Sequence, residues 1–374
     1  MEIDTATVGD PLRLLSLDGG GIHGLSALFI LQDLMRSVNP DNPPKPCDYF
    51  DPIGWTSTGG LIAIMLGRLG MDIQQCIDAY QQLSKGAFHP RRQLRIPFRR
   101  AQGFDQVSRR FDGDKITQIV KEIVRGAGEH ADARLKLSED PQCKVFVCAA
   151  VQDVIEPILL RNYDSPGVSQ DNCMIWEACR ATSAATPFFE PAVPPSNGQL
   201  SEGVTSWNNS YWDWSPTMDP PQSNVIQTLK AIVAEAGRTA EDFESEHKEL
   251  GLFGSYFRFN VEEGLENVGL DEYTAVPTIV SAKTAYLRNR GMSELQHCVS
   301  RLRQQSARQD VTSRLCALDT NEQLWLLTLF NPNLYLDLST QKVQTVDGCT
   351  PFKSSVDFRR FKLRKNVYII DPHS

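Results

Sequence analysis

The sequence predicts an α/β fold whose mostly parallel central sheet is flanked by helices. Two strand-like runs, at Leu12–Leu17 and at residues 49–53, each stop at a turn of small residues that opens into an apolar helical pattern. A third run, residues 145–151, is apolar throughout, as strands are when both faces of a parallel sheet are covered. Strands that alternate with helices in this way are typical of α/β domains.

The first strand-like run ends in three consecutive glycines, and a helical pattern follows them. Bare backbone N–H groups at the positive end of a helix favour negative charge, either a bound phosphate or an oxyanion formed during a reaction. Residues 19–24 also fit the G-x-G-x-x-G pattern of dinucleotide-binding proteins, but the acidic residue expected about 20 positions later would fall in the loop at 40–44. A tight turn without chemistry is the third interpretation. We favour an oxyanion site made by Gly19, Gly20 and Gly21, because of the turn that follows the second strand.

A serine lies on this second turn, between the strand at 49–53 and a helix expected at 59–69. A serine on a sharp strand-to-helix turn is the nucleophile elbow, G-x-S-x-G, in which small residues two positions before and after the serine let strand and helix approach closely. Around Ser57, Gly59 is the second small residue, whereas Trp55 replaces the first. We expect Trp55 to push strand and helix apart or to project into the site. On this pattern alone, Ser57 is interpreted as an ordinary helix cap.

Three segments carry a resemblance to a known family: Asp-Gly-Gly-Gly-Ile-His-Gly at 18–24, Thr-Ser-Thr-Gly-Gly at 56–60, and Ala-Cys-Arg-Ala-Thr-Ser-Ala-Ala at 178–185. Together they resemble the patatin-like phospholipase family. The segments at 46–51 and 256–261 are most similar to the patatin domains of fungal proteins. The resemblance implies a three-layer patatin-like α/β fold.

The likeness runs from about residue 12 to about residue 300. Beyond it, short apolar runs at 324–330, 334–338 and 367–370 alternate with polar loops. We therefore divide the chain into a patatin-like acyl hydrolase domain at 12–304 and a C-terminal extension of unknown role at 305–374.

The resemblance implies a Ser-Asp dyad, in which the serine attacks an acyl carbonyl and an aspartate acts as its base without a histidine. Ser57 is the implied nucleophile, and the position of the base falls on Glu202, whose side chain is one methylene longer. Without the family, Glu202 would be interpreted as a solvated turn carboxylate. His23 is a further departure, since the family usually has Arg or Lys there.

Two functions follow from this combination of likeness and departure. The resemblance implies a lipid acyl hydrolase of the phospholipase or esterase type with altered active-site motifs. The alternative is a catalytically impaired or repurposed patatin-fold protein that acts as a binding or regulatory module, and Trp55 favours it. A Ser-His-Asp triad with His247 or His297 is also conceivable, but neither histidine has a motif around it.

Residues 85–110 hold eight basic side chains and one acidic side chain, and so a net charge of +7 in a chain whose net charge is −8. Apolar residues interrupt the arginines, as in a segment that lies on anionic lipid headgroups. A solvated loop is the equally weighted alternative. The arginines that would contact a membrane are Arg91, Arg92, Arg95, Arg99 and Arg100. We expect no nucleic acid partner, because the basic charge is confined to one short stretch of an acidic protein.

The remaining features concern location and further elements. Residues 1–11 lack a signal-peptide pattern, and no apolar run reaches the ~18 residues of a membrane span. Nine cysteines without a C-x-x-C pair are typical of free thiols in a reducing compartment, so we expect a cytoplasmic protein. The six histidines show no metal-ligand spacing, and we expect neither metal nor cofactor. Further helices are expected at 174–184 and 225–236.

Overall fold

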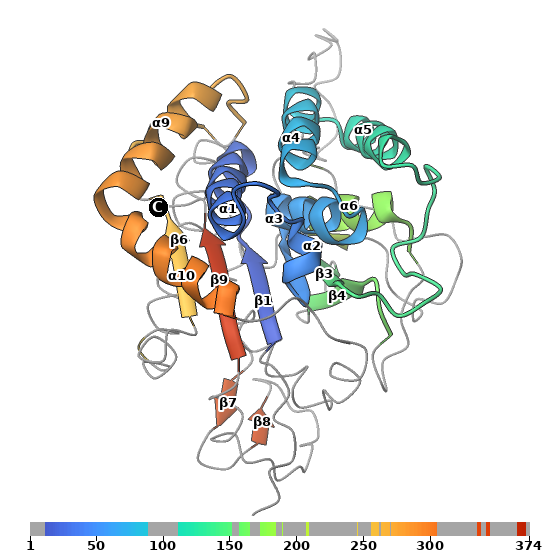
Figure 1. The fold of residues 1–374 in the computed structure, drawn as a ribbon. Helices are drawn as coiled ribbons and strands as arrows, with labels where there is room; N and C mark the ends of the chain where they lie inside the picture. The colour runs from blue at the N-terminus through green and yellow to red at the C-terminus, as the bar shows by residue number, and fades with distance from the viewer. Residues whose placement is uncertain are drawn as a thin grey trace, which may run out of the picture.

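A mostly parallel sheet with the strand order β4-β3-β2-β1-β9-β6 lies at the centre of the structure, a computed structural model (Figure 1). The structure describes residues 12–88, 111–151, 157–164, 173–184, 189, 207–208, 245, 256–261, 263–269, 271–304, 335–337, 342–344 and 365–371. The strands of this sheet are β1 (Leu12–Leu17), β2 (Pro52–Thr56), β3 (Lys144–Val151), β4 (Pro157–Arg161), β5 (Trp207–Asn208), β6 (Tyr256–Asn260) and β9 (Lys365–Asp371). All neighbours pair in parallel except β4 and β5, which both run antiparallel to β3. The predicted α/β class with a mostly parallel sheet flanked by helices is confirmed.

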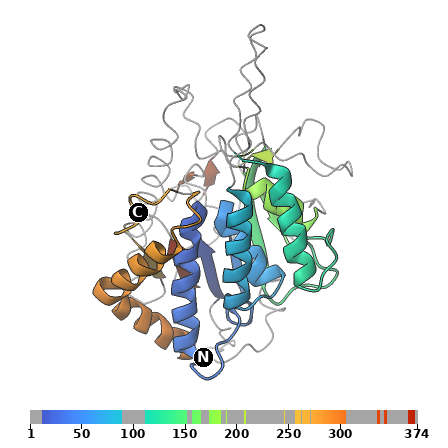
Figure 2. The same ribbon diagram turned by 90° about the horizontal axis from the view of Figure 1, so that it is seen from above.

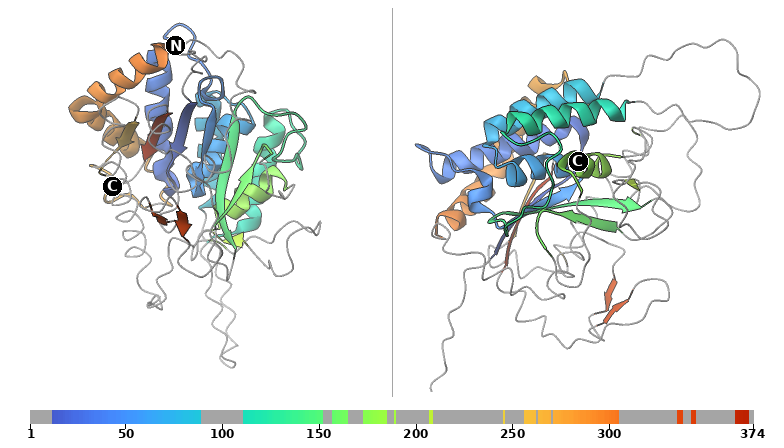
Figure 3. Two further views of the ribbon diagram at one scale, coloured as in Figure 1. Left: turned by 90° about the horizontal axis from the view of Figure 1, so that it is seen from below. Right: turned by 90° about the vertical axis from the view of Figure 1, so that its right-hand side faces the viewer.

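Three helices lie side by side over one face of this sheet, as Figure 2 and the right-hand view of Figure 3 show. They are α1 (Gly24–Val38), α4 (Ile73–Ala87) and α5 (Gly113–Gly126). In α1 the fully buried side chains recur at helical spacing, as predicted, at Leu25, Leu28, Leu31 and Met35. They join Leu15 and Leu17 of β1 in the main hydrophobic core, and among the strands α1 packs mainly against β9, the neighbour of β1.

The second strand lies three residues later than predicted. Residues Pro46–Tyr49 form a short helix, α2, which begins at a proline whose fixed φ suits the first helical position. The strand then starts at Pro52, where a missing N–H costs no ladder bond, and runs through Thr56. The helix that follows, α3 (Ser57–Ala63), also begins two residues before its predicted start, and a π-helical turn over Ile64–Arg68 continues it.

Two other sequence predictions agree with the structure. The run at 145–151 lies in β3, where Val145, Val147 and Ala149 are buried in the main core. The helix expected at 174–184 is α6 (Ile175–Thr182). The helix expected at 225–236 lies outside the described residues.

The chain beyond residue 270 contributes both helices and a strand. Helices α9 (Val276–Tyr286) and α10 (Met292–Gln304), joined by the π-helical turn Leu287–Gly291, pack on the outer side of α1. Arg303 of α10 donates hydrogen bonds to the carbonyl groups of Ser37 and Val38 at the C-terminal end of α1, where helix carbonyls lack partners.

Strand β9 comes from the predicted C-terminal extension, yet it lies between β1 and β6 in the central sheet. Two further short strands, β7 (Tyr335–Asp337) and β8 (Lys342–Gln344), pair with each other. The division of the chain at 304/305 therefore stays a prediction about sequence likeness, since the sheet takes a strand from the part beyond it. Within the part of the chain that the structure describes, no helix has the length and apolar character to cross a bilayer.

Candidate active site

Ser57 occupies an unusual backbone conformation at the junction of β2 and α3. Its φ is 54°, and it is the one non-glycine residue with a positive φ among those the structure describes. The left-handed region costs a residue with a Cβ roughly 1–2 kcal/mol, so neighbouring contacts must hold it there. One such contact is a hydrogen bond of 2.8 Å that the Ser57 N–H donates to Oγ1 of Thr182, at the end of α6. This is the geometry of a sharp strand-to-helix turn with a serine at its tip.

Two glycines after the serine let α3 approach the ends of the strands. A Cβ at Gly59 would lie 1.7 Å from the carbonyl oxygen of Leu17, and a Cβ at Gly60 would lie 2.9 Å from Oγ1 of Thr182. Real atoms do not approach this closely, so only glycine fits at Gly59. The structure thus gives Gly59 the role that the elbow pattern predicts for it.

Trp55 does not push strand and helix apart, since α3 and β2 stay in contact, and its projection into the site, the other predicted effect, stays a prediction. Trp55 continues β2, pairs with Val147, and packs half-buried against a small cluster of Leu14, Phe146 and Cys148, distinct from the main core that α3 joins. One position earlier, a Cβ at Gly54 would lie 2.6 Å from the ring of Phe146 in β3, so glycine there makes room for this ring. The bulky side chain of Trp55 is therefore accommodated without moving α3 away from β2.

The glycine turn after β1 lies directly against the serine turn after β2. A Cβ at Gly19 would lie 2.7 Å from Cβ and 3.4 Å from Oγ of Ser57. The two turns meet because β1 and β2 are adjacent parallel strands, whose carboxyl ends share one edge of the sheet. Gly21, with φ 53°, takes a conformation that glycine adopts at little cost. The structure therefore brings together two of the turns that the sequence predicts to form one site.

The amides of the glycine turn are not all available to a bound oxyanion. The Gly20 N–H donates a hydrogen bond of 2.8 Å to Oγ1 of Thr58, and the His23 N–H donates one of 3.1 Å to the Gly20 carbonyl. The next two N–H groups belong to Gly21 and Ile22, at the start of the 3-10 turn Gly21–His23, where helical N–H groups lack partners. No described residue accepts a hydrogen bond from either. The donor predicted at Gly20 is thus used within the protein, and Ile22 joins Gly21 as a candidate.

The side chain of His23 connects the glycine turn to the loop that contains Val268. This side chain is buried, and Nε2 donates a hydrogen bond of 3.0 Å to the carbonyl oxygen of Val268, which fixes the proton on Nε2. The histidine that stands in place of the usual Arg or Lys therefore ties the glycine turn to the loop before α9.

Three residues at the site have no predicted role in the sequence: Thr58, Tyr80 and Thr182. Thr182 belongs to the segment at 178–185 that carries the family likeness, but nothing in that pattern says that its hydroxyl bonds to the Ser57 N–H. Tyr80, in the middle of α4, donates a hydrogen bond from its hydroxyl to the carbonyl oxygen of Gly21. Its only sequence signal is its position on the apolar face of an amphipathic helix.

Other predicted site residues are elsewhere or outside the described chain. Glu202, His247 and the arginines at 91–100 lie outside the described residues. His297 lies on α10, in a groove of about 520 Å³ beside β6 whose lining includes neither Ser57 nor the glycine turn. Among the described side chains, no group of three or more His, Cys, Asp or Glu residues could hold a metal ion.

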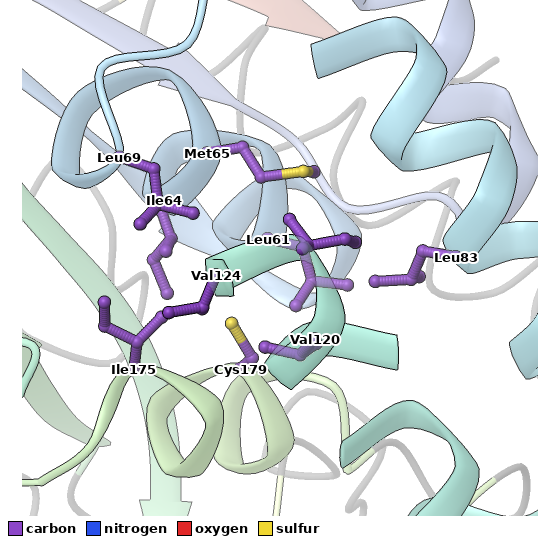
Figure 4. Close-up of a pocket in the computed structure, with 10 residues that line it drawn as sticks. Leu61, Ile64, Met65, Leu69, Leu83, Val120, Val124, Ile175 and Cys179 are labelled. Carbon is purple, nitrogen blue, oxygen red and sulfur yellow. The ribbon is translucent and has the colours of Figure 1, made fainter. Parts of the chain in front are cut away.

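A small apolar cavity lies between α3, α4, α5 and α6, and Figure 4 shows the side chains that line it. It measures about 10 Å³ and is lined by Leu61, Met65, Leu83 and Cys179, among others. A space of this size holds at most one water molecule, and its apolar walls offer a water no partner. It is a packing defect of the core and not a substrate pocket.

Comparisons with known proteins agree with this arrangement. The family model of patatin-like phospholipases matches residues 15–213, more than half of the chain, and includes both turns. Phospholipase A I of Arabidopsis thaliana is 30% identical over 242 residues, which cover 60% of this chain and 17% of that protein. Calcium-independent phospholipase A2-gamma of Mus musculus is 26% identical over 302 residues, 71% of this chain and 36% of that protein.

A third relative, "Probable inactive patatin-3-Kuras 1" of Solanum tuberosum, is 26% identical over 207 residues, 52% of this chain and 50% of that protein. The chain thus matches half or less of the length of each of these relatives. The match of the family model, together with the two turns that meet at the ends of β1 and β2, shows that the chain belongs to the patatin-like phospholipase family.

Proposed function

We propose that this protein is a lipid acyl hydrolase in which Ser57 attacks the acyl carbonyl. The observation that carries the proposal is the position of Ser57, held at φ 54° on a strand-to-helix turn, against the glycine turn. Strained conformations of this kind are retained where function requires them. Two of the relatives are named as phospholipases, which supports a lipid ester as the substrate class.

The proposed reaction has two steps. Oγ of Ser57 bonds to the acyl carbon and its proton passes to a carboxylate base, while the carbonyl oxygen becomes an oxyanion facing the N–H groups of Gly21 and Ile22. The alcohol then leaves with that proton, and a water molecule hydrolyses the acyl-serine. Glu202 is the proposed base, on the strength of the family resemblance alone. Preorganised N–H donors of this kind each contribute about a hundredfold to a thousandfold in rate.

The second candidate is a patatin-fold protein that has lost or changed its hydrolysis. The longer side chain at Glu202 favours it, because a displacement of about 1 Å can cost roughly a hundredfold in rate. A relative named as inactive also favours it. The variant Glu202→Asp discriminates between the two: an esterase limited by the added methylene should become up to about a hundredfold faster on a short-chain ester. A folded variant without any gain would count against the misplaced base as the cause of low activity.

Labelling with a fluorophosphonate tests the proposal, because this probe reacts with an activated serine without requiring the natural lipid. The wild type should be labelled and Ser57→Ala should not. Ser281→Ala, on the exposed face of α9, is the matched control and should be labelled like the wild type. Equal labelling of the wild type and Ser57→Ala would contradict the assignment of Ser57.

Contact with an anionic membrane is a separate proposal that rests on the +7 charge of residues 85–110. Binding to vesicles that contain phosphatidylserine should weaken as salt rises, since the Debye length falls from about 10 Å at 0.1 M to about 3 Å at 1 M. Replacing the arginines at 91–100 by glutamine should remove this binding. Binding that does not respond to salt would exclude the electrostatic contact.

We also propose a cytoplasmic location. The seven described cysteines are all free thiols, and six of them are buried, in line with the reducing compartment that the sequence suggests. Fractionation of the cells that express the protein would test this, and recovery with the secreted fraction would contradict it.

A further inference from the structure

Tyr80, on helix α4, contacts the backbone of the glycine turn. Its side chain is fully buried, and its hydroxyl donates a hydrogen bond to the carbonyl oxygen of Gly21. The tip of the ring occupies the space beside Gly24, where a Cβ would lie 2.8 Å from the Tyr80 oxygen. Glycine at this position therefore allows a phenol to approach the backbone of the turn.

Thr58 and Tyr80 contact neighbouring peptide groups of the same turn. The Gly20 N–H donates to Oγ1 of Thr58, the residue after Ser57, and the Gly21 carbonyl accepts from the Tyr80 hydroxyl. Burial raises the pKa of Tyr80 far above its ordinary value. The phenol is therefore neutral and keeps its proton to donate to Gly21.

These bonds fix the direction in which two amides point. The C=O and N–H groups of a trans peptide unit point in opposite directions. The Gly20 carbonyl is held by the His23 N–H, which turns the Gly21 N–H the opposite way. The Gly21 carbonyl accepts hydrogen bonds from the Gly24 N–H and from the Tyr80 hydroxyl, which turn the Ile22 N–H the opposite way. Gly21 itself has a positive φ and no side chain, so the turn depends on such outside contacts to stay in one conformation.

We propose that Tyr80 is a positioning residue for acyl hydrolysis, which holds the Gly21–Ile22 peptide so that its N–H faces the oxyanion. This inference rests on the proposed function of the Ser57 site. Tyr80 does not touch the substrate and acts through the backbone of the glycine turn.

The variant Tyr80→Phe tests the role because it removes the hydroxyl and keeps the ring. With p-nitrophenyl butyrate as the substrate, we expect kcat to fall about tenfold at unchanged KM, less than the loss of a whole oxyanion donor would cost. The matched control is Tyr286→Phe in α9, which removes the hydroxyl of a half-buried ring that likewise has a backbone partner, here the Asn260 N–H at 3.3 Å. The control should keep the kcat of the wild type.

Hydrogen–deuterium exchange gives a second readout that does not depend on activity. The peptide that covers residues 19–24 should exchange faster in Tyr80→Phe than in the wild type and in the control. If Tyr80→Phe does not fold, Gly24→Ala crowds the Tyr80 hydroxyl, whose oxygen would lie 2.8 Å from the added Cβ, and should give the same two changes. Unchanged exchange at 19–24, or an unchanged kcat in an active enzyme, would overturn the inference. A wild type that neither hydrolyses the ester nor takes the probe would overturn the proposed function itself, and the exchange would still decide whether Tyr80 holds the turn.

Discussion

The two strand–turn–helix units of the site differ in the kind of group that they present to a substrate. After β1 the chain turns through glycines, and what it presents there is backbone, the N–H groups of Gly21 and Ile22. After β2 the chain turns through Ser57, and what it presents is a side chain. Both turns use a positive φ, 53° at Gly21 and 54° at Ser57. Glycine adopts this conformation at little cost, whereas serine must be held in it.

Because one turn is built on serine and the other on glycine, different contacts stabilise each of them. Two contacts stabilise the serine turn. Oγ1 of Thr182 accepts a hydrogen bond from the Ser57 N–H, and the missing Cβ at Gly59 lets α3 pack against the end of β1. The glycine turn is held from outside by the hydroxyls of Tyr80 and Thr58, and from within by the buried side chains of Ile22 and His23. A backbone site therefore shows in the sequence as glycines, whereas its supports lie far away along the chain.

Exchanging serine for glycine at the second turn should have the largest effect, because it makes the two turns alike. In Ser57→Gly we expect ester hydrolysis to fall at least about a thousandfold with the loss of the nucleophile. The free energy of unfolding should rise by about 1 kcal/mol, since the strain at positive φ is relieved. Kinetic assays measure the rate of hydrolysis, and urea denaturation measures the free energy of unfolding. A less stable variant would mean that Ser57 is not strained.

A methyl group at the helix start should have the next largest effect. In Gly59→Ala the added Cβ meets the Leu17 carbonyl at 1.7 Å, so α3 must move away from β1. We expect a loss of about 3 kcal/mol in the free energy of unfolding, as in overpacked cores. Gly126→Ala is the control, because its Cβ meets nothing within 4 Å and should stabilise the end of α5 by about 0.5 kcal/mol. Equal stabilities of the two variants would contradict the close approach.

Removing the support of the serine turn should cost less. Thr182→Val keeps the shape of the side chain but leaves the Ser57 N–H without its acceptor, which should cost about 1–3 kcal/mol in stability. The probe should also label Ser57 more slowly, since the turn loses its anchor. Thr284→Val, on the exposed side of α9, removes a comparable hydroxyl and should change neither quantity. Equal labelling rates in both variants would show that Thr182 does not orient the nucleophile.

The smallest effect is expected at Trp55. Because this side chain packs against Leu14, Phe146 and Cys148 and does not separate β2 from α3, Trp55→Phe should lower stability by only about 1 kcal/mol. The rate of ester hydrolysis should not rise. A large gain in rate would restore the original expectation that Trp55 obstructs the site.

The sequence predicts the parts of this structure that depend on local pattern. The apolar runs of β1 and β3 and the helical spacing of α1 follow from periodicity, and the position of Gly59 follows from the turn between β2 and α3, whereas the role of Ser57 came from the family resemblance. These signals are local, because a strand, a helix and a tight turn each leave their mark on neighbouring residues.

The contacts that hold the site could not be predicted in this way. Thr182 is 125 positions from Ser57, and Tyr80 is 59 positions from Gly21, so no spacing in the chain reveals either hydrogen bond. The packing of Trp55 could not be predicted either, because the sequence pattern gives the size of a side chain but not the residues that it packs against. The apolar run at 367–370 likewise does not show which strands it pairs with, so the position of β9 between β1 and β6 could not be predicted.

We propose above that Ser57, strained at the tip of its turn and facing the glycine turn, is the activated nucleophile. The most direct measurement is to treat the wild type with a fluorophosphonate, digest it, and locate the added mass by tandem mass spectrometry. We expect one adduct, on the Oγ of Ser57, which disappears in Ser57→Gly. An adduct on another serine, or no adduct on a folded protein, would contradict it.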